Sequence, residues 1–292
     1  MTQKNAHPLV SVLIGMGSAA VGLFPWIVTG ARLPLQNLGD VDTDIHNMPI
    51  VGLPFSQYLI FQIVAVIVIG AAVAGIVARN IGGTLPILGG LLLVQVAALV
   101  QTAVVTESGL RDTKLAAFYM LALCVGTIAA ILLGVGMMLL IARAPKAGAL
   151  LAFALAGVAL SSWLTALFFP ISRISTSSPT TDALRTVIDF APAVVVGAAI
   201  VWCGLGTVGR IIAAVASLGI LFAGPILVGA ISVAVGSRAL LPHPAELLGA
   251  GLTYIGIVTE TPETWGPPIG LAVAIAVVGL VARRVVAKRT TA

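Results

Sequence analysis

The sequence predicts an all-α fold, a polytopic bundle of about eight transmembrane helices. Three observations lead to this prediction. The 292 residues are 59% hydrophobic and only 9% charged, whereas a soluble domain has about 25% charged residues. The mean hydropathy is +1.14. Several apolar runs reach the roughly 20 residues that a helix needs to cross about 30 Å of hydrocarbon.

The long apolar runs of the chain are the expected spans. The expected spans are residues 9–29, 57–78, 84–106, 115–142, 149–169, 192–209, 211–236 and 268–286. We expect the first to be a retained span and not a cleaved signal peptide, because it resembles the other seven. Residues 244–258 are apolar but short for a crossing. An interfacial helix and a re-entrant hairpin are the two alternatives for this segment.

The charges divide between alternate connections of these spans. One face, which includes both termini, has nine basic residues and no acidic residue: Lys4, Arg79, Arg143, Lys146, Arg210, Arg283, Arg284, Lys288 and Arg289. The other face has six basic residues and all ten acidic ones. Because Lys and Arg decide orientation, the pattern predicts a multi-pass plasma (inner) membrane protein with cytoplasmic termini and external acidic loops. The pI near 9.7 then reflects topology, so we expect no nucleic-acid partner.

The two halves of the chain, 1–146 and 147–292, resemble each other weakly. Phe24-Pro25 ends the first span and Phe169-Pro170 ends the fifth, and a long external loop follows each pair. Arg79 and Arg210 occupy matching turns. With four spans each, both halves enter the membrane from the same side, which predicts parallel four-helix repeats. Chance similarity of apolar segments is the alternative explanation.

The first external loop contains the candidate metal ligands. Asp40, Asp42, Asp44 and His46 alternate along the chain, so an extended segment would place all four side chains on one side. Carboxylate oxygens suit Ca²⁺ or Mg²⁺. The glycine and the final glutamate of an EF-hand loop are missing, since Ile45 and Val51 occupy those positions. A solvated acidic loop without a metal is the alternative.

Residues Gly224 and Pro225 interrupt the seventh span near its middle. Proline removes a helix hydrogen bond, and broken helices near the midplane often form the substrate path of a transporter. A static packing kink is the alternative.

No nucleotide-binding P-loop, zinc-protease or serine-hydrolase motif occurs, and no charge lies deep in an expected span. The sequence therefore favours a non-enzymatic protein of the bacterial cell envelope, either a permease-like transporter or the membrane subunit of a complex with other envelope proteins. The alternative is an outer-leaflet enzyme that acts on a lipid-linked substrate with a divalent metal at the Asp40–His46 loop. In support of this alternative, the acidic first external loop of the chain resembles that of membrane glycosyltransferases that use lipid-phosphate sugars.

Overall fold

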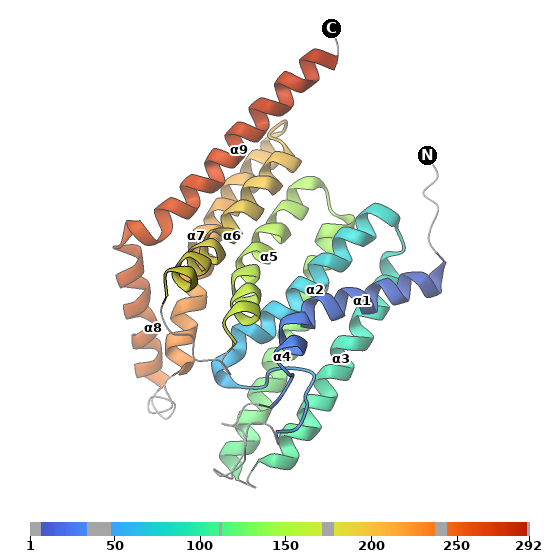
Figure 1. Ribbon diagram of the computed structural model, residues 1–292, viewed down its shortest axis with the longest axis vertical. Helices are drawn as coiled ribbons and strands as arrows, with labels where there is room; N and C mark the ends of the chain where they lie inside the picture. Colours follow the sequence, from blue (N-terminus) through green and yellow to red (C-terminus); the bar gives the residue numbers. More distant parts are fainter. Residues whose placement is uncertain (1–6, 34–47, 111–112, 171–177, 237–243, 291–292) are drawn as a thin grey trace. The chain divides into compact units, whose positions relative to one another are not determined.

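The computed structural model describes residues 7–33, 48–110, 113–170, 178–236 and 244–290, and these are helical with short connections (Figure 1). Eight of the described helices are long and apolar enough to cross a membrane. The predicted all-α polytopic bundle is confirmed. The chain forms two compact units. Unit 1 comprises Met1–Arg143 and Ser162–Ser175, and unit 2 comprises Ala144–Ser161 and Thr176–Ala292.

The described residues of unit 1 form four long helices, one short helix and the end of a further long one. They are α1 (Pro8–Val28), α2 (Ile60–Ile81, preceded by the short helix η3, Gln57–Leu59), α3 (Thr84–Gly109), α4 (Lys114–Arg143) and the last residues of α5 (Lys146–Phe168). Helix α1 packs against α2 and α3, and α2 also packs against α4.

Small residues allow these helices to approach closely. A methyl group added to Gly15 of α1 would overlap the backbone of Ile87 in α3, and one added to Gly70 of α2 would lie 3.0 Å from the carbonyl oxygen of Ser18. In a membrane, small residues at helix contacts let backbones approach and gain van der Waals contact. Gly15 and Ala19 of α1, and Gly70 and Ala74 of α2, are all buried in the interior of unit 1.

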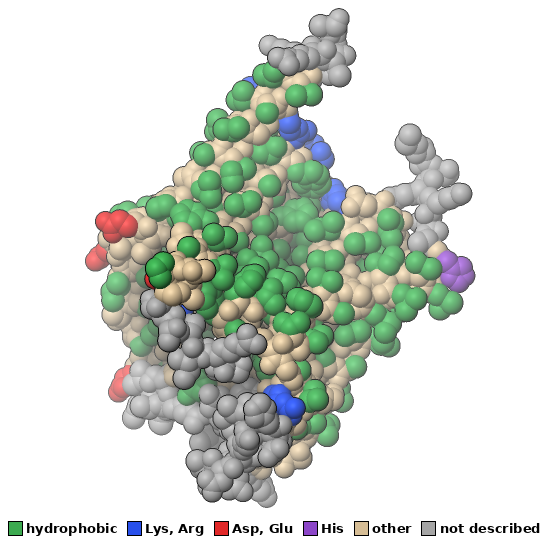
Figure 2. Space-filling view, viewed as in Figure 1, with side chains coloured by type: hydrophobic (Ala, Val, Ile, Leu, Met, Phe, Trp, Pro, Cys, Tyr) green, Lys and Arg blue, Asp and Glu red, His purple; other side chains and the backbone are tan. Residues whose placement is uncertain are grey.

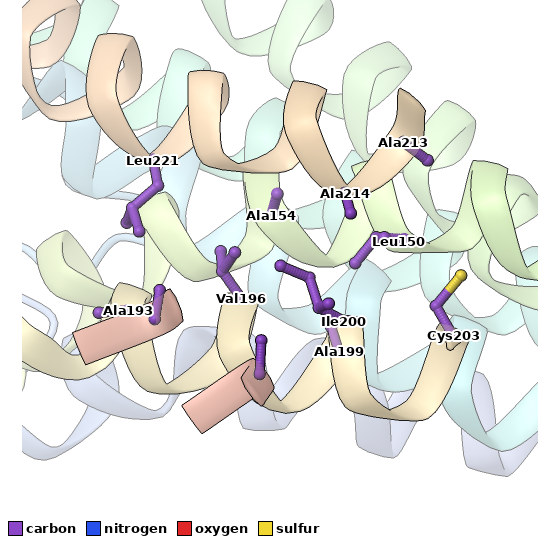
Figure 3. Packing of buried hydrophobic residues seen from close by; sticks show 12 residues of the cluster. Leu150, Ala154, Ala193, Val196, Ala199, Ile200, Cys203, Ala213, Ala214 and Leu221 are labelled. Atoms are coloured by element: carbon purple, nitrogen blue, oxygen red, sulfur yellow. The ribbon is translucent and has the colours of Figure 1, made fainter. Parts of the chain in front are cut away.

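Unit 2 contains the rest of α5 with α6 (Pro179–Cys203), α7 (Val208–Gly236), α8 (Pro244–Thr259) and α9 (Pro262–Thr290). Its core contains Leu and Ala of α5, Ala, Val, Ile and Cys of α6, Ala and Leu of α7, and Ala of α9 (Figure 3). Helix α9 runs parallel to α6, because Gly197 meets Ile275 and Val201 meets Gly279. The predicted repeats 1–146 and 147–292 stay a prediction, and the compact units divide α5 after Ser161.

The expected boundaries of the sixth span are wrong at both ends. The helix begins at Pro179 and not at 192, because Ser178 and Thr181 form a capping box and proline is favourable in the first turn. It ends at Cys203, where Gly204 has a φ of +73°. Asp182, Arg185 and Asp189 thus lie on the helix itself. The prediction that the spans lack charge fails here, although Asp189 is exposed on the helix surface.

The short apolar segment forms α8, which lies antiparallel to the C-terminal half of α7. Tyr254 contacts Gly229, and Gly251 contacts Ala230. The surface of α8 away from α7 is apolar too, with Leu248, Leu252 and Ile257 all more than half exposed. The two alternatives for this segment, an interfacial helix and a re-entrant hairpin, both stay predictions.

Candidate functional site

A short non-helical segment, residues 48–56, buries most of its side chains inside unit 1, and we call it the anchored segment. Met48, Val51, Leu53 and Phe55 are each at most 1% exposed. Leu53 and Phe55 join a core cluster with residues of α2 and α4. The sequence interpretation placed these residues in an external loop. The apolar run Met48–Phe55 was the signal that could have indicated their burial.

Side chains of α1 and α3 form hydrogen bonds with backbone N–H and carbonyl groups of the anchored segment. Gln101 accepts a hydrogen bond from the Gly52 N–H through Oε1 and donates one from Nε2 to the Ile50 carbonyl, both at 2.8 Å. Thr102 Oγ1 accepts from the Leu53 N–H at 2.9 Å, and Trp26 Nε1 donates to the Val51 carbonyl at 2.8 Å. Non-helical backbone is tolerated at membrane depth only when protein or water covers it.

The segment touches α3 so closely that one position requires glycine. A Cβ on Gly52 would lie 2.8 Å from both Cα and Cβ of Ala98. The backbone of the segment therefore rests directly on α3, and any side chain at this position would push it away.

The anchored segment also closes the base of the acidic loop. The Leu33 N–H donates to the Pro49 carbonyl at 2.9 Å, and the Val51 N–H donates to the Ala31 carbonyl at 2.8 Å. Arg32 Nη1 donates to the Met48 carbonyl at 2.6 Å. The residues that flank 34–47 on both sides are thus joined.

The predicted metal ligands Asp40, Asp42, Asp44 and His46 lie outside the described residues, so this site stays a prediction. Among the residues that the structure does describe, no three His, Cys, Asp or Glu side chains gather closely enough to hold a metal ion.

A row of buried polar side chains follows one face of α3, and we call Gln95, Thr102 and Thr106 the polar stripe. Their exposures are 4%, 0% and 0%, and their spacing of seven and four residues places them on one helix face. Gln95 Nε2 donates to the Ile67 carbonyl of α2 at 3.1 Å. Within the described part of the chain, Gln95 Oε1 and Thr106 Oγ1 have no hydrogen-bond partner.

Unsatisfied polar atoms of this kind cost about 1–3 kcal/mol each, so their presence in an apolar bundle calls for an explanation. Gln95 lies near the middle of the 26 residues of α3. The sequence interpretation missed this stripe because it searched the spans for ionisable groups only. The signal was an amide in the apolar run Leu91–Val100.

The predicted hinge residues lie within an uninterrupted helix. Helix α7 continues through Gly224 and Pro225, and proline cannot donate to the Leu221 carbonyl one turn earlier. A Cβ on Gly224 would lie 2.7 Å from Val158 Cγ2 of α5, so glycine permits this close contact. Pro225 is exposed on the outer surface of the helix. This pair belongs to unit 2, whereas the polar stripe belongs to unit 1.

Together, the eight apolar helices and the covered backbone of the anchored segment define a multi-pass membrane protein of the helical-bundle class. No protein family, curated protein or solved structure matches this chain.

Proposed function

We propose that the protein is a permease-like transporter of a small polar solute, and that the polar stripe of α3 contributes to the solute path. The supporting observation is the buried, unpaired Gln95 Oε1 at mid-span. Buried polar groups inside membrane helices are costly and mark substrate pathways. The Gln95 amide and the Thr106 hydroxyl can exchange hydrogen bonds with a solute that has lost its water, and the Thr102 hydroxyl can still donate one while it accepts from Leu53.

Flux measurements test this proposal. We expect the purified full chain in liposomes to admit at least one labelled polar solute, from a panel of sugars, amino acids and polyols, faster than empty liposomes do. Gln95→Leu replaces the amide side chain by an apolar side chain of similar size. If one hydrogen bond of about 1.4 kcal/mol is lost from the path, flux falls about tenfold.

Thr127→Val is the matched control. Thr127 is as buried as the polar stripe, but its hydroxyl donates to the Leu123 carbonyl of its own helix at 2.8 Å. Removal of the Thr127 hydroxyl leaves no other group unpaired. Flux should therefore stay within about twofold of wild type, because a threonine bond to the backbone of its own helix contributes little. Equal flux through wild type and Gln95→Leu would contradict the proposed path.

Co-purification with a fixed set of envelope proteins, without flux, would instead support a subunit of a cell-envelope complex.

The proposal includes the orientation in a plasma (inner) membrane. Nine basic residues against six favour cytoplasmic termini. Reporter fusions at Ala292 and within the loop after Gly236 provide the test. An active cytoplasmic reporter at both positions would exclude this orientation, because α7 ends on the face opposite the C-terminus in the proposed topology.

A second candidate is the outer-leaflet enzyme that acts on a lipid-linked substrate with Ca²⁺ or Mg²⁺ at Asp40, Asp42, Asp44 and His46. The observation that favours it is the joined base of this loop, since fixed ends lower the entropy lost when a loop closes around an ion. The double variant Asp42→Asn/Asp44→Asn should abolish divalent-cation binding measured by calorimetry. Unchanged binding would exclude this site.

A further inference from the structure

Three basic side chains from three helices gather at the C-terminal end of α6 in unit 2, and we call Lys146, Arg210 and Arg283 the basic cluster. Lys146 Nζ of α5 donates to the Trp202 carbonyl at 3.4 Å and lies 5.3 Å from the centre of the Trp202 ring. Arg283 Nη1 of α9 donates to the Val201 carbonyl and, at 3.5 Å, to that of Trp202.

Arg210 of α7 completes the cluster. Its Nη1 lies 3.8 Å from the position of a Cβ on Gly206, in the turn between α6 and α7. Arg283 Nη1 lies 3.9 Å from the position of a Cβ on Gly204, the residue that follows the end of α6. All three cations therefore surround the same helix end.

The helix end explains part of this arrangement. The last carbonyls of a helix have no partner within the helix, and the C-terminal end has a partial negative charge, so Lys and Arg are favourable there. These contacts use few of the available donors, since a guanidinium group has five N–H donors and an ammonium group three. Within the described part of the chain, the remaining donors of these three side chains make no hydrogen bond, so they can bind an anion.

No carboxylate on α6 or α9 comes near enough to neutralise the cluster. Asp189 precedes Cys203 by fourteen residues on α6, which is about 21 Å of helix. Glu263 precedes Arg283 by twenty residues on α9, or about 30 Å. Figure 2 shows this separation, with basic side chains over the C-terminal half of α9 and acidic ones near its beginning.

Exposed apolar side chains also lie in the turn after α6 and at the start of α7. Leu205 in the turn and Val208 and Ile212 at the start of α7 are 41%, 74% and 63% exposed. Trp202, which is half-buried, adds the kind of aromatic ring that prefers the headgroup level of a membrane. Positive charge and exposed apolar side chains at the same end of unit 2 match a molecule with an anionic head and hydrocarbon tails.

We propose that this end of unit 2 binds an anionic phospholipid. The basic cluster holds the phosphate group, and Leu205, Val208 and Ile212 contact the acyl chains. Basic sites between transmembrane helices bind anionic headgroups through the same combination of charge and position. This inference does not depend on the proposed transport activity.

The test is thermal unfolding of the full chain in neutral detergent, titrated separately with phosphatidylglycerol, phosphatidylcholine and inorganic phosphate. We expect phosphatidylglycerol to raise the unfolding midpoint more than the other two. Arg210→Gln should require about fivefold more phosphatidylglycerol for the same shift, since one cation near an anionic lipid contributes about 1 kcal/mol. Arg210 is the position of choice because Lys146 and Arg283 also cap α6.

The matched control is Lys114→Gln, which removes one exposed positive charge at the start of α4 in unit 1. It should bind phosphatidylglycerol as wild type does. If Arg210→Gln does not fold, salt provides the second measurement, because raising NaCl from about 50 to 500 mM should weaken the wild-type shift by screening. Equal shifts with phosphatidylcholine, equal shifts with phosphate alone, or a salt-independent shift would each overturn the proposal.

Discussion

Gly90 and Gly89 of α3 are neighbours in sequence with opposite surroundings, and they provide a sharp test of the packing in unit 1. A Cβ on Gly90 would overlap the Val12 carbonyl of α1 and lie 3.1 Å from the Met16 nitrogen. A Cβ on Gly89 would have no atom within 4 Å. Gly90→Ala therefore forces α1 away from α3, whereas Gly89→Ala adds a methyl group to an open surface.

The magnitudes follow from these contacts. Overpacking costs about 1–3 kcal/mol, and the upper end applies to Gly90 because the obstacle is backbone that cannot change rotamer. Replacing glycine by alanine within a helix stabilises it by about 1 kcal/mol. Gly90→Ala should thus destabilise by about 2 kcal/mol and Gly89→Ala stabilise by up to about 1 kcal/mol. At about 2–4 °C per kcal/mol, the two midpoints should lie about 6–12 °C apart.

The assay is thermal unfolding in detergent followed by tryptophan fluorescence. Trp163 reports on unit 1 because its Nε1 donates to the Gly22 carbonyl of α1 at 2.8 Å. Midpoints within about 2 °C of each other would show that α1 does not contact α3 at Gly90, since less than 1 kcal/mol would then separate the variants.

Two further substitutions test the anchored segment and α7. Thr102→Val leaves the buried Leu53 N–H without its acceptor and should lower the free energy of unfolding by about 1–3 kcal/mol. Denaturant titration measures this loss, with the exposed Thr186→Val as the control. A loss below about 0.5 kcal/mol would refute the role of Thr102. Pro225→Ala restores a donor for the Leu221 carbonyl and should raise the unfolding midpoint. If Pro225 acts as a hinge, the same variant lowers solute flux, and unchanged flux favours the static kink.

The anchored segment shows why part of the candidate site could not be predicted from the sequence. A hydropathy pattern reports whether a run can cross the bilayer, and residues 48–56 are too few to do so. Their burial depends on Gln101 and Thr102, which lie about fifty residues later in the chain. The polar stripe is a similar case, because the unpaired state of Gln95 Oε1 depends on which helix faces it.

The sixth helix shows a different limit. The charges of Asp182, Arg185 and Asp189 led to the prediction of a loop before residue 192. A helix, however, tolerates charges in its first turns. The local signals for its true start were present at Ser178 and Pro179. Hydropathy outweighed them in the interpretation, although capping chemistry decides where a helix begins.

The sequence by itself determined the class of this protein, because the thickness of the hydrocarbon core sets the length of an apolar helix and every backbone polar group must bond within it. Only the tertiary structure decided which residues meet. The close contacts of Gly15 and Gly90, the burial of the anchored segment and the gathering of Lys146, Arg210 and Arg283 all join residues far apart in the chain. Such contacts depend on shape complementarity between helices, which periodicity and charge along a single chain do not encode.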